Sequence, residues 1–125
     1  MSPRRAVLAA AVALAPAGCD ASPGPDVVEV APAAARRGDA VAILGARFCG
    51  GSTMSDEIEE GRCARAPAGS VAFGLDLPIA RAEVLSWRDA RIEAVVPQAA
   101  AVGPSLVVVT VNGRASNGGD FEVLP

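Results

Sequence analysis

The groups in this sequence that could do chemistry are thiols and a short run of carboxylates. The thiols belong to Cys19, Cys49 and Cys63, and the carboxylates to Asp56, Glu57, Glu59 and Glu60. Two carboxylates held close together can exchange protons as a general acid and base, and several oxygen ligands can hold Ca²⁺. A cysteine nucleophile needs a neighbouring base, and the sequence contains no histidine to supply one.

The acidic run lacks the spacing of a cation site. The Asp-x-Asp-x-Asp-Gly pattern of an EF-hand is absent. Nothing else in the sequence positions a pair of carboxylates for acid–base work. We therefore expect a solvated acidic loop with no metal, no cofactor and no enzymatic activity. A calcium site, or an active site built on Glu57 and Glu59, is the alternative that this loop leaves open.

Trp87 is the one aromatic residue that could form a ligand platform. Its ring could stack on a sugar, but the sequence has only three phenylalanines besides it and no tyrosine. A lone ring makes a poor carbohydrate face, so we expect Trp87 to anchor the core. Its role as a ligand-binding residue is kept as the alternative.

The charge balance excludes one class of partner. Eleven arginines and no lysine stand against fourteen acidic residues, and the formal net charge is −3. Phosphate recognition needs clustered cations. The composition therefore argues against binding to nucleic acid and against attraction to an anionic membrane surface.

The first eighteen residues read as an export signal. Arg4 and Arg5 precede an apolar run over 6–17, which is too short to span a bilayer but has the length of a signal-peptide core. The small residues before Cys19 resemble the lipobox of bacterial lipoproteins, in which the chain is cut before an acylated cysteine. Ala15-Pro16-Ala17 also fits an ordinary A-x-A cleavage site, which would give a secreted or periplasmic soluble protein. Residues 19–26 form a Pro- and Gly-containing linker.

Acylation of Cys19 would leave an even number of thiols. We therefore predict a disulfide between Cys49 and Cys63, consistent with an exported chain. It would close an acidic insertion at 49–63. Two reduced thiols at the base of a loop are the alternative.

From Val27 onward, short apolar runs alternate with turn residues, as in a chain of strands. We expect strands at 27–30, 40–44, 70–75, 79–87, 91–96, 105–111 and 114–116, with an interruption at 117–119 before Phe121 and Val123. Two-residue periodicity places two sets of side chains inward: Val28 and Val30 in the first strand, and Val71, Phe73 and Leu75 in the third.

Two local signals fix details of this pattern. Asn112-Gly113 is the strongest two-residue hairpin signal, because a type I′ turn needs positive φ at both positions. Gly45 has no Cβ and can lie at a bulge or a close approach, which allows Phe48 to fold back onto the core.

The expected strands describe an all-β, immunoglobulin-like β-sandwich of about seven strands. Over 27–125 the sequence resembles an IPT/TIG domain. The resemblance depends on an ordered series of segments: 28–32, 38–48, 71–74, 84–89, 92–97, 107–111 and 115–117. In that family these residues build the fold and carry no chemistry. The insertion after Phe48, with its cysteines, departs from the family pattern.

Together these features predict an exported, non-catalytic lipoprotein of a bacterial cell envelope. Its domain would contact another envelope or surface protein, or act as a spacer, with a lipid anchor on Cys19 in the membrane. The alternative is a carbohydrate-binding accessory domain of an extracellular polysaccharide system.

Overall fold

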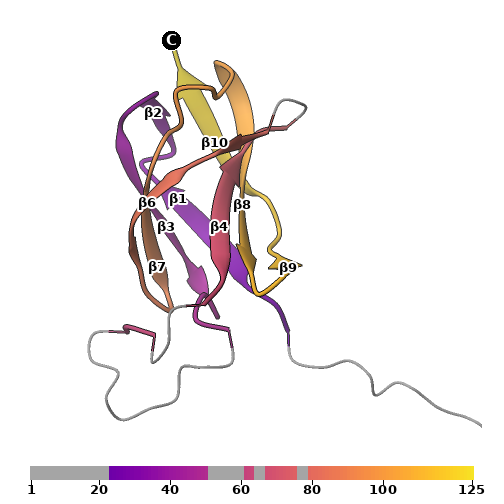
Figure 1. The fold of residues 1–125 in the computed structure, drawn as a ribbon. Helices are drawn as coiled ribbons and strands as arrows, with labels where there is room; N and C mark the ends of the chain where they lie inside the picture. Colours follow the sequence, from indigo (N-terminus) through magenta and orange to yellow (C-terminus); the bar gives the residue numbers. More distant parts are fainter. Residues whose placement is uncertain (1–22, 51–60, 64–66, 76–78) are drawn as a thin grey trace, which may run out of the picture.

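Strands in two sheets make up the part of the chain that the structure describes (Figure 1). The structure is a computed structural model, and it describes residues 23–50, 61–63, 67–75 and 79–125. These residues include no helix. The predicted all-β class is confirmed.

One sheet contains four antiparallel strands in the order β1-β3-β7-β6. Their bounds are β1 Asp26–Ala31, β3 Ala40–Ala46, β7 Arg91–Val95 and β6 Glu83–Trp87. The other sheet has the order β2-β10-β8-β4-β5, with β9 paired to β8. Its strands are β2 Ala34–Arg36, β10 Gly119–Leu124, β8 Gly103–Val111, β4 Gly69–Phe73, β5 Ala80–Arg81 and β9 Arg114–Ala115.

A single core draws residues from both sheets. In β8, the alternate residues Val107, Val109 and Val111 are buried, as the two-residue period of a strand requires. Ile92 and Ala94 of β7, in the other sheet, belong to the same cluster and are fully buried. The rings of Phe73 and Phe121 meet edge to face with their centroids 5.4 Å apart. The shared core joins the two sheets.

The prediction that Val28 points inward was wrong. Val28 is 72% exposed, and Val27 and Val30 are the buried residues of β1. The register with β3 shifts between Val27 and Glu29, so β1 contains a bulge at Val28. An extra residue in one strand reverses the alternation on one side of it.

The single strand predicted at 79–87 is two strands in different sheets. β5 pairs with β4, whereas β6 pairs with β7. Between them, the N–H of Ala82 donates to the carbonyl of Val71 at 2.8 Å. The chain therefore crosses from one sheet to the other near Ala82. Apolar and polar residues continue to alternate through the crossing, so the sequence pattern does not reveal it.

Two other details differ from the expected strands. Leu75 is 50% exposed because β4 ends at Phe73, so Leu75 does not continue its buried face. β2 was not predicted: its Ala-Ala-Arg sequence has low strand propensity, and it forms by parallel pairing with β10.

The predicted hairpin and the predicted glycine contact are both confirmed. Val111 pairs with Arg114 across Asn112 and Gly113, whose φ angles are 50° and 86°. A Cβ on Gly45 would lie 2.6 Å from the ring of Phe48, which is fully buried. Only glycine leaves room for that ring.

Candidate functional site

The predicted disulfide is present at one end of the molecule. Cys49 and Cys63 are bonded, with their Cα atoms 5.2 Å apart. Cys49 is fully buried just after β3, and Cys63 lies before β4. A disulfide indicates an extracellular or periplasmic location. The described residues include no helix of the length and hydropathy that a bilayer crossing requires.

Asp89 holds the two sides of this loop base together. Its carboxylate accepts from the N–H of Cys49 at 3.1 Å, and its carbonyl accepts from the N–H of Phe48 at 3.0 Å. Its own N–H donates to the carbonyl of Gly61 at 2.8 Å. The turn between β6 and β7 is therefore hydrogen-bonded to both ends of the insertion, at Phe48 and Cys49 on one side and at Gly61 on the other.

Trp87 belongs to the same assembly. Its indole N–H donates to the carbonyl of Phe48 at 2.7 Å, and the ring packs partly buried against the core. A Cβ added at Gly69 would lie 2.5 Å from the ring, so one part of the indole lies directly on the β4 backbone. A stacked ligand could therefore use only the remaining exposed surface of the ring.

The other five predicted site residues lie outside the described residues. These are the proposed lipidation site Cys19 and the four carboxylates Asp56, Glu57, Glu59 and Glu60. Within the described ranges, no group of three or more His, Cys, Asp or Glu side chains is arranged to hold a metal ion. The described part of the site consists of the disulfide, Asp89 and Trp87.

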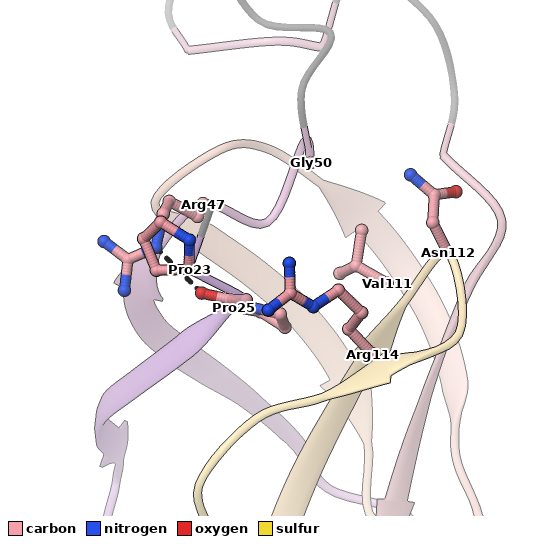
Figure 2. Close-up of a pocket in the computed structure, with 8 residues that line it drawn as sticks. Pro23, Pro25, Arg47, Gly50, Val111, Asn112 and Arg114 are labelled. Carbon is pink, nitrogen blue, oxygen red and sulfur yellow. Dashed lines mark hydrogen bonds between the residues drawn. The ribbon is translucent and has the colours of Figure 1, made fainter. Parts of the chain in front are cut away.

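A pocket of about 210 Å³ lies where the N-terminal segment meets the domain (Figure 2). Pro23, Gly24 and Pro25 form one side of it. The other lining residues come from the ends of β3 and β8 and from the start of β9: Arg47, Gly50, Val111, Asn112 and Arg114. We call it the tether pocket.

Two arginine side chains contact the N-terminal segment at the tether pocket. The Nε–H of Arg47 donates to the carbonyl of Gly24 at 2.8 Å, drawn as a dashed line in Figure 2. The Arg114 side chain lies against Gly24 from the other side, with its Nε 3.5 Å from the point a Cβ would occupy. Pro25 is buried. The segment therefore enters β1 in a fixed direction.

The hairpin turn forms the remaining wall of the tether pocket. Asn112 exchanges two hydrogen bonds with Ala68: its N–H donates to the carbonyl at 2.6 Å, and its side-chain oxygen accepts from the N–H at 3.1 Å. These bonds fix the turn that positions Arg114. Two of the described lining residues, Arg47 and Arg114, carry guanidinium groups.

Arg47 and Arg114 were not among the residues predicted for the site. They are far apart in sequence, and an argument from net charge averages them with the acidic residues elsewhere. The signal was partly available, because Arg114 directly follows the predicted Asn-Gly turn and Arg47 lies two residues after Gly45. That these two positions lie at the same end of the molecule becomes evident only with the strand order.

Comparison with known proteins finds similar folds among solved structures. No protein-family model and no curated protein matches the chain. A crystal structure of a gamma-CGTase from alkalophilic Bacillus clarkii is similar, with 28% sequence identity and a TM-score of 0.58. The match covers 84% of this chain and 13% of that chain. This structural neighbour is a carbohydrate-active enzyme, and the chain spans only a small part of its length.

Proposed function

We propose that this chain is a non-catalytic envelope lipoprotein that presents one immunoglobulin-like β-sandwich of the IPT/TIG type. Residues 1–18 act as its signal peptide and are removed before Cys19, which carries the lipid. The predicted linker 19–26 joins the lipid to the domain, and its last residues are part of the domain, because Gly24 accepts from Arg47, Pro25 is buried and Asp26 begins β1. The domain contacts another envelope or surface protein or acts as a spacer. It needs no cofactor.

The geometry of the N-terminal segment is the observation that carries this proposal. The segment leaves at the end that holds the disulfide, and the C-terminal residue lies at the opposite end (Figure 1). Because Arg47 and Arg114 hold Gly24, a lipid on Cys19 would orient the whole domain, with the end near Pro125 outermost. The disulfide supports export.

Metabolic labelling with palmitate tests the proposal. Cells expressing the full chain incorporate label into it, and globomycin causes the unprocessed precursor to accumulate. A Cys19→Ala variant, which keeps Ala15-Pro16-Ala17, is the matched control and stays unlabelled. An unlabelled wild-type protein in the soluble fraction would contradict the proposal.

A second candidate function is a carbohydrate-binding accessory domain, and the likeness to the gamma-CGTase favours it. In this role the exposed part of the Trp87 ring is the stacking surface. A glycan array with wild-type protein and two variants tests it. Trp87→Ala abolishes binding, whereas Trp87→Phe keeps an aromatic ring and most of the affinity. Equal signals from all three proteins would rule out Trp87 as the platform.

A further inference from the structure

We propose that Asn112 is a site of spontaneous deamidation and that the fold protects the other asparagine, Asn117, from the same reaction. Each asparagine is followed by a glycine, Gly113 or Gly118. The inference goes beyond the proposed function and depends on neither the lipid anchor nor a partner. It assigns a covalent modification to the turn that lines the tether pocket.

The reaction needs only an asparagine, the residue after it and water. The backbone nitrogen of the following residue attacks the side-chain Cγ of asparagine. A bond forms between these two atoms, the bond from Cγ to Nδ2 breaks, and the peptide proton leaves with the amine as ammonia. Water then opens the five-membered imide at one of its two carbonyls and gives aspartate or isoaspartate. Asparagine is therefore a thermolabile residue, and a following glycine favours the attack because no Cβ shields its nitrogen.

Both Asn-Gly pairs lie in connections next to β9. The pair at 112–113 joins β8 to β9, and the pair at 117–118 lies between β9 and β10. All four residues are exposed, so water reaches both pairs. Exposure therefore does not distinguish the two asparagines, and the difference must come from what holds each side-chain amide.

The amide of Asn117 is held at both of its polar atoms. Its oxygen accepts from the N–H of Val27 and its NH₂ donates to the carbonyl of Val27, both at 2.8 Å. Cγ cannot turn toward the nitrogen of Gly118 unless both bonds break. A Cβ added at Gly118 would lie 3.1 Å from the Leu106 side chain, so that side chain also covers one side of the glycine.

The amide of Asn112 is held less firmly. Among the described residues, one hydrogen bond holds it, from the N–H of Ala68 to the side-chain oxygen at 3.1 Å. No described atom lies within 4 Å of the point that a Cβ on Gly113 would occupy. Since Asn112 has one bond fewer to break, we expect it to react about fivefold faster than Asn117, the factor that one typical hydrogen bond is worth.

Deamidation of Asn112 would change the tether pocket in two ways. Both products place a carboxylate on a wall that Arg47 and Arg114 also line (Figure 2). Aspartate keeps an oxygen that can accept from the N–H of Ala68, whereas isoaspartate adds a carbon to the backbone of the turn that Val111 and Arg114 close. We therefore expect aspartate to preserve the hairpin and isoaspartate to loosen it.

The first experiment measures both rates in one sample. The folded full chain is incubated in mildly alkaline buffer, and aliquots are digested with trypsin. Cleavage after Arg91 and Arg114 places the two asparagines on separate peptides, 92–114 and 115–125. Chromatography with mass spectrometry separates the asparagine, aspartate and isoaspartate forms of each peptide. We expect the peptide 92–114 to convert about fivefold faster than the peptide 115–125.

Two controls make this measurement specific to the fold. In guanidinium chloride with the disulfide reduced, both pairs should react at similar rates, because each asparagine precedes a glycine. Asn112→Gln keeps an amide but has a longer side chain that closes the imide ring slowly, so the peptide 92–114 should stay unmodified while Asn117 reacts as before. Equal rates in the folded chain, or a faster reaction at Asn117, would overturn the proposal.

The second experiment tests the effect on the turn. The deamidated fraction, isolated by ion exchange through its added negative charge, contains both products, whereas Asn112→Asp contains aspartate only. We expect Asn112→Asp to melt close to wild type and the deamidated fraction to melt at a lower temperature. Equal melting temperatures for the deamidated fraction and Asn112→Asp would contradict the loosening of the turn by isoaspartate.

Discussion

The two ends of the molecule are held by different kinds of contact. At the end that holds the tether pocket, which we call the tether end, three kinds of contact join separate segments of the chain: a disulfide, the hydrogen bonds of Asp89 and the hydrogen bond of the Trp87 indole. At the opposite end, the ties are a local turn and arginine side chains that donate to backbone carbonyls. Contacts between distant parts of the sequence occur at both ends, since Arg36 and Pro125 are 89 positions apart and Arg37 and Ala100 are 63 apart. The two ends differ in burial and in the kind of bond: the first has a disulfide and the fully buried Phe48 and Cys49, whereas the arginines at the opposite end are exposed.

The opposite end also leaves apolar side chains in solvent. Leu75, Ile79 and Val102 are each about half exposed. Arg36 and Asp39 close a turn through two hydrogen bonds, at 3.0 and 3.1 Å, around Gly38 with φ 90°. We therefore expect substitutions at the tether end to cost far more stability than substitutions here.

The largest expected effect is that of Phe48→Ala. The Phe48 ring is fully buried against Gly45, so its removal leaves a cavity beside the disulfide and lowers the free energy of unfolding by about 3–5 kcal/mol. Val102→Ala, at the exposed end, changes it by less than about 0.5 kcal/mol. Urea denaturation of both variants measures the contrast, and similar midpoints would remove the difference between the ends.

Removal of the disulfide comes next. Cys49 and Cys63 are separated by 14 positions, and a closed loop of that size stabilises by about 3 kcal/mol in the chain-entropy model. The Cys49→Ala/Cys63→Ala double variant should therefore lose about that much. Wild-type protein under reducing conditions serves as the comparison. A loss below about 1 kcal/mol would show that the Asp89 bonds alone hold the loop base.

Asn117→Ala should have an intermediate effect. The Asn117 side chain acts as a short substitute for a neighbouring strand: its oxygen accepts from the N–H of Val27 and its NH₂ donates to the carbonyl of Val27, both at 2.8 Å. Losing both bonds at the β1 bulge should cost about 1–3 kcal/mol. Asn117→Asp, which keeps only the acceptor, should lose less. Equal losses in the two variants would contradict the two-bond account.

The smallest effect expected at the tether end is that of Trp87→Phe. This change keeps an aromatic ring on Gly69 and removes the indole N–H that donates to the carbonyl of Phe48. The expected loss is about 1 kcal/mol, the typical net worth of one hydrogen bond. Thermal unfolding measures it, and a loss as large as that of Phe48→Ala would mean that ring packing, not the hydrogen bond, is the main contribution.

The parts of the fold that were predictable from the sequence depend on local chemistry. The Asn112-Gly113 turn needs positive φ, and Gly45 next to Phe48 needs a missing Cβ, so both follow from residue type. The Val28 bulge and the crossing near Ala82 do not, because pairing with another strand decides them. Both leave the apolar pattern of the sequence intact.

The candidate site divides in the same way. The disulfide followed from the number and spacing of cysteines together with the likeness to a lipobox. The tether pocket was missed although Arg114 directly follows the predicted turn, because Arg47 and Arg114 become neighbours only through the strand order and an argument from net charge averages them with the acidic residues. The hydrogen bonds of Asp89 at the base of the insertion were missed for the same reason. An aspartate in a turn can bond to many different groups, and the tertiary structure decides which ones.

Mass spectrometry of the mature N-terminus from expressing cells tests the central claim most directly. The account predicts a chain that begins at Cys19 with a diacylglyceryl group on the thiol and an acyl group on the amine. A soluble chain that begins at Gly18 and carries an unmodified Cys19 would contradict it.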